Sequence, residues 1–249
     1  MIQLKDKVAL VTGGSAGLGA AICEQLAAEG VNIAINYSNN EQRAQDLSNK
    51  LKDQYGVKSI VLKADIFDIK NLHKLVDETV EQLGQIDILI SNAGWTEIIP
   101  YTDLDAMTEE VWDGTFNANV KAHYFLFKAA KPYFDSNKDG GTFISSASVA
   151  GRITFGSSIP YAVSKAALIH LIKFLAKTQS NIRSHAVCPG LLLTEWGKKF
   201  SEEKIQKSID ASPLKKSTDI DECASEYIHL CKLSSSTGSI VAMDAGLSL

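Results

Sequence analysis

Cysteine and proline are both scarce in this sequence. The 249 residues include four cysteines and five prolines. No two cysteines form a Cys-x-x-Cys pair, and their spacing suits neither a zinc site nor the disulfide framework of a small secreted domain. We therefore expect reduced thiols in a reducing compartment. The five histidines are scattered along the chain, so we expect no metal site.

An excess of charge of one sign is also lacking. The net charge of −4 comes from 25 basic and 29 acidic residues, so the chain does not offer the basic face that nucleic-acid binding requires. An apolar strand follows Met1–Lys7 directly, which leaves no room for a signal peptide. No apolar run approaches membrane-spanning length. We therefore expect a soluble, cytoplasmic protein that binds neither nucleic acid nor a membrane.

Short β-branched segments alternate with longer helical patterns along the whole chain. Strands are expected at 7–12, 31–37, 58–64, 86–91, 141–147, 182–188 and 239–242, and helices at 17–29, 41–55, 69–83, 108–135, 158–178 and 219–231. Apolar strands separated by helices predict a parallel sheet that is covered on both faces. No repeat or linker interrupts the pattern. The prediction is one α/β domain over 1–249, a doubly wound Rossmann-type fold with about seven strands, in which 191–214 is a variable stretch.

A glycine-rich turn follows the first expected strand. It reads Thr12-Gly13-Gly14-Ser15-Ala16-Gly17-Leu18-Gly19 and opens the first helix. Glycines let a ligand approach the backbone closely, and the free N–H groups at a helix start suit a pyrophosphate. A glycine-rich turn alone is weak evidence, but the strand–turn–helix context is the one that a dinucleotide site requires. Cofactor contacts are predicted for Gly13, Ser15, Gly17, Leu18 and Gly19.

Tyr161 and Lys165 lie on one face of an expected helix, because they are four residues apart. An ammonium group near a phenol favours the phenolate, which lowers the pKa of tyrosine from about 10 toward a useful range for acid–base chemistry. By itself such a pair is usually an ordinary surface pair. Pro160 places Tyr161 in the first turn of the helix, beside the carboxyl ends of the strands, where such folds bind ligands.

Serines gather at the end of the fifth expected strand. Ser145, Ser146 and Ser148 each carry a hydroxyl that is able to donate a hydrogen bond to a substrate oxygen. For Ser145 and Ser146, satisfaction of nearby backbone groups is the better interpretation.

Together these motifs resemble the short-chain dehydrogenase/reductase family, in the branch with chains of this length that includes 3-oxoacyl reductases and carbonyl reductases. The resemblance covers essentially the whole chain. The family motifs fall on Thr12, Gly13, Gly17 and Gly19 of the turn, on Asn92-Ala93-Gly94, on Asn119, on Ser148, on Tyr161 and Lys165, and on Pro189-Gly190 with Thr194.

The resemblance implies a mechanism of hydride transfer between a nicotinamide cofactor and a ketone or secondary alcohol. Ser148 would polarise the substrate oxygen, and Tyr161 would donate a proton to it or accept one from it. Lys165 would lower the pKa of Tyr161 and hold the nicotinamide ribose. Asn119 would support a water molecule that links Lys165 to solvent.

The resemblance also implies further cofactor contacts. Asn92 is an even choice between a cofactor contact and a brace for the sheet. The implied residues are Asp65 and Ile66 beside the adenine, Asn92, Ala93 and Gly94 along the cofactor, and Pro189, Gly190 and Thr194 beside the nicotinamide.

The end of the second strand departs from the pattern of NAD-binding members. Asn36, Tyr37 and Ser38 stand where the cofactor's ribose is expected, without the usual acidic residue. Because no carboxylate repels a 2′-phosphate there, NADP(H) is favoured and NAD(H) is the alternative. However, Ala16 stands where NADP-dependent members often carry a basic residue. Arg43 is the nearest cation, and it is equally interpretable as a solvated helix residue.

Another departure is His185, which stands where relatives often have asparagine and which we interpret as a packed strand histidine.

Trp95, Phe155, Trp196 and Phe200 predict an apolar, partly aromatic substrate pocket, with packing in the core as the alternative for several of them. The leading hypothesis is an NADP(H)-dependent oxidoreductase. The alternatives are an NAD(H)-dependent alcohol dehydrogenase and a non-catalytic NADP-binding sensor.

The apolar end 238–249 resembles segments used in family tetramers, so we predict a homo-oligomer, a tetramer or a dimer.

Overall fold

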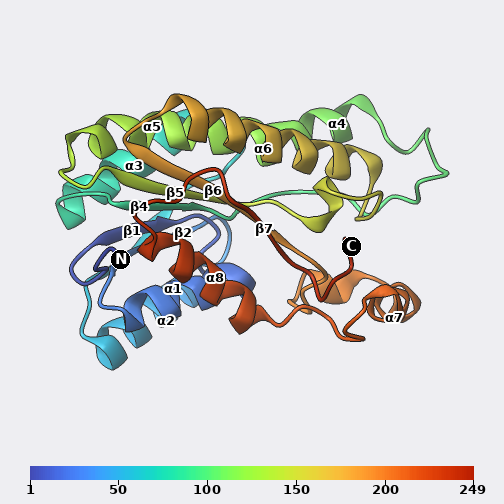
Figure 1. The fold of residues 1–249 in the computed structure, drawn as a ribbon, viewed down its shortest axis with the longest axis horizontal. Coiled ribbons are helices and arrows are strands. Elements are labelled where there is room, and N and C mark those ends of the chain that lie inside the picture. The colour runs from blue at the N-terminus through green and yellow to red at the C-terminus, as the bar shows by residue number, and fades with distance from the viewer.

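A parallel sheet of seven strands forms the centre of the computed structural model, which describes residues 1–249 (Figure 1). The strands are ordered β3-β2-β1-β4-β5-β6-β7, and every neighbouring pair is parallel. They are β1 (Val8–Val11), β2 (Asn32–Tyr37), β3 (Ser59–Lys63), β4 (Ile88–Ser91), β5 (Gly141–Ser146), β6 (Ile182–Pro189) and β7 (Ile240–Met243).

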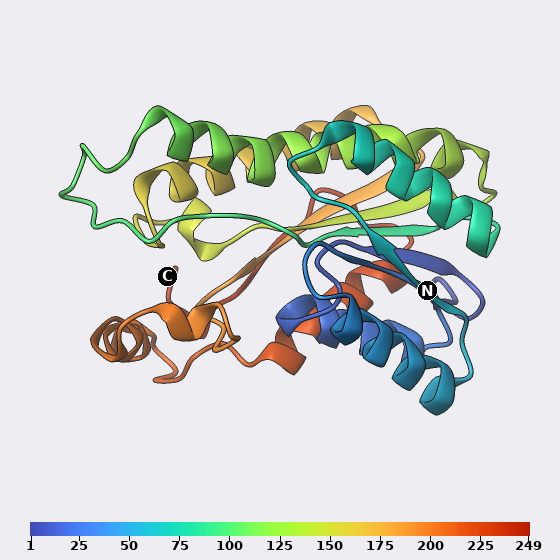
Figure 2. The same ribbon diagram turned by 180° about the vertical axis from the view of Figure 1, so that it is seen from behind.

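Helices cover both faces of the sheet (Figures 1 and 2). One face carries α1 (Gly17–Ala28), α2 (Glu41–Tyr55) and α8 (Ile220–Lys232). The other carries α3 (Ile69–Leu83), α5 (Ala122–Ser136) and α6 (Ile159–Thr178), with α4 (Glu109–Phe116) packed against α6. Two short 3₁₀ turns, at 149–151 and 197–199, lie in the connections, and α7 (Glu202–Ala211) stands apart from both layers, near the C-terminus.

Two apolar cores lie on opposite sides of the sheet. Strand β1 shows how the sequence divides between them: Ala9 and Val11 belong to one core, and Leu10 belongs to the other. This follows from the alternation of side chains along a strand. All three residues are fully buried, as expected for a parallel sheet covered on both faces. The predicted fold class is therefore confirmed.

One sequence-based expectation about apolar runs is wrong. Helix α6 is long and apolar enough, by length and composition, to cross a membrane. In the structure it is a core helix, because Leu168 and Ile172 are completely buried against the sheet. The expectation failed because α6 combines apolar residues on its buried face with alanines on its other faces. Its mean hydropathy therefore reaches that of a helix that faces lipid.

Two elements were not predicted. The expected helix 108–135 is divided by a π-helical segment, Asn117–Lys121, between α4 and α5. A π segment has no distinct side-chain periodicity over one turn, but such segments frequently mark functional sites. Helix α7 lies within the variable stretch, where its polar sequence gave no core-facing pattern.

Candidate active site

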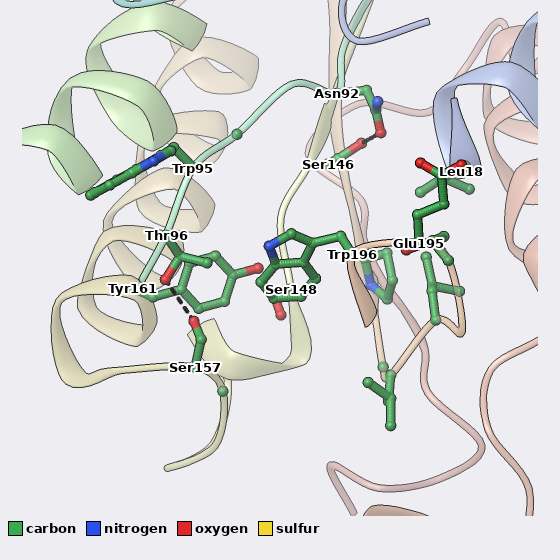
Figure 3. A pocket seen from close by; sticks show the side chains of 18 of the residues that line it. Leu18, Asn92, Trp95, Thr96, Ser146, Ser148, Ser157, Tyr161, Glu195 and Trp196 are labelled. Atoms are coloured by element: carbon green, nitrogen blue, oxygen red, sulfur yellow. Dashed lines mark hydrogen bonds between the residues drawn. The ribbon is translucent and has the colours of Figure 1, made fainter. Parts of the chain in front are cut away.

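A large cavity opens at the carboxyl ends of the strands, where the strand order reverses between β1 and β4. Its volume is about 800 Å³, and Figure 3 shows part of its lining. The predicted site residues that line it are Ser15, Gly17, Leu18, Asn92, Gly94, Ser148, Tyr161, Lys165, Pro189, Gly190 and Thr194. The structure therefore brings together residues from the turn after β1 and from the segments after β4, β5 and β6.

The glycine turn forms one end of this cavity. Gly17 has a φ of 50°, a left-handed conformation that favours glycine. A Cβ atom at Gly19 would lie 2.2 Å from the carbonyl oxygen of Gly13, so a side chain is excluded there. Ala16 precedes α1 and gives it no side-chain cap, which leaves the first N–H groups of the helix free. The free N–H groups and the lack of side chains fit the pyrophosphate of a dinucleotide.

A buried amide holds the turn in place. Asn36 is 2% exposed, and its Oδ1 accepts a hydrogen bond from the Gly13 N–H (3.2 Å). Its Nδ2 donates to the carbonyl oxygens of Leu62 (3.2 Å) and Ala64 (3.1 Å), which lie in and just after β3. The side chain of Asn36 is thus engaged within the protein, and its role in the structure is to fix the turn against two strands.

Asn92 braces the neighbouring strands. Its Nδ2 donates to the Thr12 carbonyl (3.1 Å), and its Oδ1 accepts from the Ser146 hydroxyl (3.0 Å; Figure 3). The Thr12 hydroxyl in turn accepts from the N–H groups of Asn92 (2.9 Å) and Ala93 (3.1 Å). The bracing interpretation of Asn92 is confirmed, while the residue also lines the cavity.

Other predicted cofactor residues lie at or after the ends of β2 and β3, at the same edge of the sheet. Tyr37 is buried, and Ser38 and Asp65 are exposed. The Asp65 carboxylate accepts a hydrogen bond from the Phe67 N–H (3.0 Å), and Ile66 is half-buried against the second core. None of these four predicted residues lines the cavity, and their contact with a cofactor stays a prediction.

Ser148 and Tyr161 face each other across the cavity floor. Ser148 precedes the 3₁₀ turn Val149–Gly151, and its hydroxyl accepts a hydrogen bond from the Ala150 N–H (3.1 Å). Tyr161 lies in the first turn of α6, where the Ser158 hydroxyl accepts from its N–H (3.4 Å) and caps the helix. The phenol of Tyr161 points into the cavity on the side of Ser148 (Figure 3), whose hydroxyl is close enough to influence the pKa of the phenol.

Lys165 is almost completely buried, at 4% exposed. Its Nζ donates to the carbonyl oxygen of Ser146 (2.8 Å) and lies 5.6 Å from the centre of the Tyr161 ring. Burial lowers the pKa of Lys165 to about 8, because a charged ammonium is poorly solvated in the interior. The lysine is therefore mostly charged at neutral pH and close to its titration range.

The expected lowering of the tyrosine pKa is not found in the protein alone. Desolvation raises the pKa of Tyr161, and the neighbouring Ser148 hydroxyl opposes this rise only in part. The reason is that the Tyr161 phenol is partly buried and so loses hydration, while the Lys165 ammonium is already bonded to Ser146. The prediction of a lowered pKa rested on the four-residue spacing of Tyr161 and Lys165, and it did not include the loss of hydration of the phenol.

Asn119 lies in the π-helical segment, completely buried. Its side chain forms a two-way link with Trp95: the Trp95 N–H donates to Oδ1 (2.9 Å), and Nδ2 donates to the Trp95 carbonyl (2.9 Å). The same Nδ2 donates to the Ser164 hydroxyl (3.1 Å) on α6. A Cβ atom at Gly94 would approach Asn119 Oδ1 to 2.8 Å, and Lys165 Nζ to 3.5 Å, so the segment after β4 runs close beside both residues.

Two histidines are buried away from the cavity lining. His185 is 0% exposed, neither ring nitrogen has a partner, and burial lowers its pKa to about 4. The prediction of a packed strand histidine is thus confirmed. His123 is also buried, with Nδ1 3.1 Å from the hydroxyl oxygen of Ser145. Ser145 therefore faces the interior, and its partner is a histidine side chain rather than the backbone group that was expected.

The opposite wall of the cavity comes from the segment after β6. Thr194 packs against the glycine turn, since its Cγ2 would lie 3.0 Å from a Cβ atom at Gly17. The adjacent Glu195 forms an ion pair with Arg43 on α2 (3.0 Å). Arg43 thus lines the same cavity as the glycine turn.

Aromatic side chains surround the remaining space. Trp95 follows β4, and Trp196 packs edge-on against Phe200. The Thr96 and Ser157 hydroxyls lie 2.7 Å apart and join the segment after β4 to the loop before α6 (Figure 3). This part of the cavity fits the predicted apolar, partly aromatic pocket.

Three contributors were missed from the sequence. The Ser146 carbonyl anchors Lys165, and a backbone carbonyl leaves no trace in residue type. The Thr12 hydroxyl binds two N–H groups after β4. The signal for this role was the place of Thr12 in the family motif. Glu195 had no detectable signal, because its partner Arg43 is 152 positions away in the sequence.

Comparisons with known proteins agree with this geometry. The family model for short chain dehydrogenases matches residues 7–205. The chain is 31% identical over 210 residues to the 3-oxoacyl-(acyl-carrier-protein) reductase FabG of Staphylococcus aureus, covering 84% of this chain and 83% of that protein. It is 31% identical over 254 residues to the sorbose reductase of Candida albicans, covering 99% of this chain and 88% of that protein.

Solved structures are similar over nearly the whole chain. A short chain dehydrogenase from Burkholderia cenocepacia in complex with NADP has a TM-score of 0.92 at 30% identity, with 100% of both chains covered. The NADPH-dependent 3-quinuclidinone reductase from Rhodotorula rubra has a TM-score of 0.91 at 25% identity, covering 98% of this chain and 92% of that one. This chain belongs to the short-chain dehydrogenase/reductase family and is an NAD(P)-dependent oxidoreductase that acts on carbonyl or alcohol substrates.

Proposed function

We propose that this protein is an NADP(H)-dependent carbonyl reductase in which Tyr161 is the general acid. The observation that carries the proposal is the arrangement of Ser148, Tyr161 and Lys165 on one cavity floor, next to a glycine turn that fits a dinucleotide. When bound, the nicotinamide supplies the hydride, and the protein supplies position and electrostatics.

Ser148 and Tyr161 hold the substrate oxygen. Both hydroxyls line the cavity, so a carbonyl oxygen placed between them accepts two hydrogen bonds. These bonds strengthen as negative charge develops on the oxygen during reduction. The Tyr161 hydroxyl then donates its proton to that oxygen. Because desolvation keeps its pKa above the ordinary value, Tyr161 is fully protonated at neutral pH, as a general acid must be.

Lys165 and Asn119 support this proton transfer. With a pKa of about 8, Lys165 carries a positive charge at neutral pH and stabilises the phenolate that Tyr161 leaves behind. The Ser146 carbonyl holds the ammonium at a fixed place. Asn119 fixes Trp95 and α6 relative to each other through its three hydrogen bonds, so its main contribution is to position the residues around Lys165.

The cofactor preference follows from charge near the adenosine end. Residues 36–40 contain no carboxylate, and Arg43 is the one cation that the N-terminal half of the chain presents to the cavity. Guanidinium groups match phosphate geometry with two parallel hydrogen bonds. We therefore assign the 2′-phosphate of NADP(H) to Arg43. Among the similar structures, one is a complex with NADP and another is an NADPH-dependent reductase, whereas a 7α-hydroxysteroid dehydrogenase is complexed with NADH.

The substrate is a ketone on an apolar framework. Trp95, Phe155, Trp196 and Phe200 supply apolar surface around the oxygen site, and apolar contact determines affinity for such a framework. Among the polar groups that line this space, the hydroxyls of Ser148 and Tyr161 are the pair that would bind a single substrate oxygen.

A direct assay tests the proposal. NADPH and NADH are each incubated with the protein and a panel of aryl, alkyl and 3-oxoacyl ketones, and the absorbance of the reduced cofactor is followed. We expect oxidation of NADPH with at least one ketone, at a kcat/KM about tenfold above that with NADH. Binding of NADPH without oxidation by any ketone would support a sensor instead, and a preference for NADH would overturn the cofactor assignment.

A further inference from the structure

An ion pair joins the two sides of the cavity at the end next to α2. Arg43 Nη1 lies 3.0 Å from Glu195 Oε2. Arg43 comes from the first turn of α2, in the N-terminal half of the sheet, whereas Glu195 belongs to the variable segment after β6. Of the nine ion pairs in the structure, this one links that segment to the half of the molecule that carries the glycine turn.

The two partners differ in how well they are held. The Glu195 side chain is 85% exposed and has no other hydrogen-bond partner, whereas the Arg43 side chain is 39% exposed, with its Nε buried and unpaired. An ion pair between exposed groups contributes little free energy. The arginine is thus a partly buried cation, and displacing the exposed carboxylate that covers it costs little free energy.

The ion pair of Arg43 and Glu195 lies next to the glycine turn, and this position indicates which ligand would displace the carboxylate. Thr194, the residue before Glu195, packs on Gly17 at the start of α1, and Ser15 and Ala16 of the same turn line the cavity with Arg43. A carboxylate and a phosphate monoester both bind a guanidinium through two oxygens, so they compete for the same nitrogen atoms. A phosphate at this place carries more negative charge than the carboxylate.

We propose that Glu195 is a built-in competitor of the 2′-phosphate: it occupies Arg43 in the free enzyme, and NADP(H) displaces it whereas NAD(H) does not. This inference rests on the assignment of Arg43 to the 2′-phosphate. Its consequence is that the identity of the cofactor is transmitted to the variable segment that carries Trp196. NADP(H) frees the segment from α2, and NAD(H) leaves it attached.

Binding measurements on Glu195→Gln test the competition. Glutamine keeps the size of the side chain and removes its charge, and Glu202→Gln, an exposed carboxylate of the same segment with no ion pair, is the matched control. We expect Glu195→Gln to tighten NADPH binding about two- to fivefold, the range that an exposed ion pair implies. NADH affinity stays unchanged, and the control changes neither.

Small probes isolate the adenosine end from the rest of the site. Adenosine 2′-monophosphate is expected to bind more tightly to Glu195→Gln than to the wild type, whereas adenosine 5′-monophosphate is expected to bind both equally. If Glu195→Gln weakens NADPH and NADH alike, Glu195 is a clamp for the segment and the competition is refuted. Unchanged NADPH affinity refutes it as well.

A second variant separates this inference from the function on which it rests. Arg43→Gln is expected to weaken NADPH binding at least about tenfold and to leave NADH binding unchanged. If Arg43→Gln weakens NADPH while Glu195→Gln has no effect, the phosphate assignment stands and only the competition fails. If Arg43→Gln has no effect on NADPH, the cofactor assignment itself fails.

Discussion

The two walls of the cavity are held in different ways. Buried hydrogen bonds fix the wall that carries the reacting groups, through Lys165 on Ser146 and Asn119 on Ser164. The wall formed by the segment after β6 is joined to the rest of the molecule mainly by exposed or partly buried side chains, such as Glu195 on Arg43.

The energies of these links differ accordingly. A buried polar group left without its partner costs about 1–3 kcal/mol, whereas an exposed ion pair contributes about 0–1 kcal/mol. We therefore expect the chemistry to depend on the strongly held sheet edge, and the choice of substrate and the response to the cofactor to depend on the wall with the weaker links. Each of the following variants removes a side-chain interaction from one of the two walls.

The largest effect is expected at the rigid wall, for Lys165→Met. We expect kcat to fall by at least about 10²-fold, because the phenolate of Tyr161 loses its nearest cation. Lys173→Met, an exposed lysine of the same helix, is the control and keeps full activity. Steady-state kinetics with NADPH measure the change, and a kcat equal to that of the control would contradict the role of Lys165.

The same variant has a defined pH dependence of stability. Burial lowers the pKa of Lys165 to about 8 in the folded state, against 10.5 for an unperturbed lysine. Between these values the unfolded chain binds more protons than the folded one, so the stability of the wild type rises with pH through this window. Between pH 7 and pH 10 the wild type should gain about 2 kcal/mol relative to Lys165→Met in urea unfolding. If the difference in unfolding free energy between the two proteins does not change with pH, the pKa of Lys165 is not lowered in the folded state.

A smaller effect is expected where the rigid wall meets the glycine turn. Asn36→Ala removes the amide that binds Gly13 and two carbonyls near β3. We expect a loss of about 1–3 kcal/mol in unfolding free energy, together with weaker NADPH binding, because buried backbone groups lose their partner. Asn39→Ala, exposed and without a hydrogen bond, controls for stability. Equal stability of the two variants would mean that water replaces the amide at no cost.

The smallest effect is expected at the wall with the weaker links, which is formed by the segment after β6. Lys204 of α7 donates to the Gly156 carbonyl (3.0 Å), which also accepts from the Tyr101 hydroxyl (2.6 Å). We expect Lys204→Met to raise KM for the ketone by about two- to fivefold and to leave kcat unchanged, since the contact is partly exposed. Lys207→Met, whose lysine pairs with Glu203 on the outer side of α7, controls for the charge. A fall in kcat without a change in KM would assign Lys204 to the chemistry instead.

The difference between the walls also explains what the sequence was able to predict. The strands, most helices and the motif residues of the rigid wall were identified, because burial imposes periodicity and the ligand site imposes fixed spacings. Residues 41–55 and 69–83 form helices with the predicted bounds. The π segment around Asn119 was missed, since its side chains continue the helical pattern on both sides.

Features that depend on three-dimensional contact were beyond the sequence. The raised pKa of Tyr161 comes from desolvation, which spacing does not report. The pair of Arg43 and Glu195 joins two polar segments with no pattern of their own. The predicted oligomer and the cytoplasmic location stay predictions.

A single measurement tests the role of Tyr161 most directly. In a single turnover with bound NADPH and an active ketone, Tyr161→Phe keeps the ring and removes only the hydroxyl that would donate the proton. We predict that the rate of NADPH oxidation falls by about 10²–10⁴-fold, while NADPH affinity is unchanged. Hydride transfer at the wild-type rate would contradict this role, because the proton would then come from a group other than Tyr161.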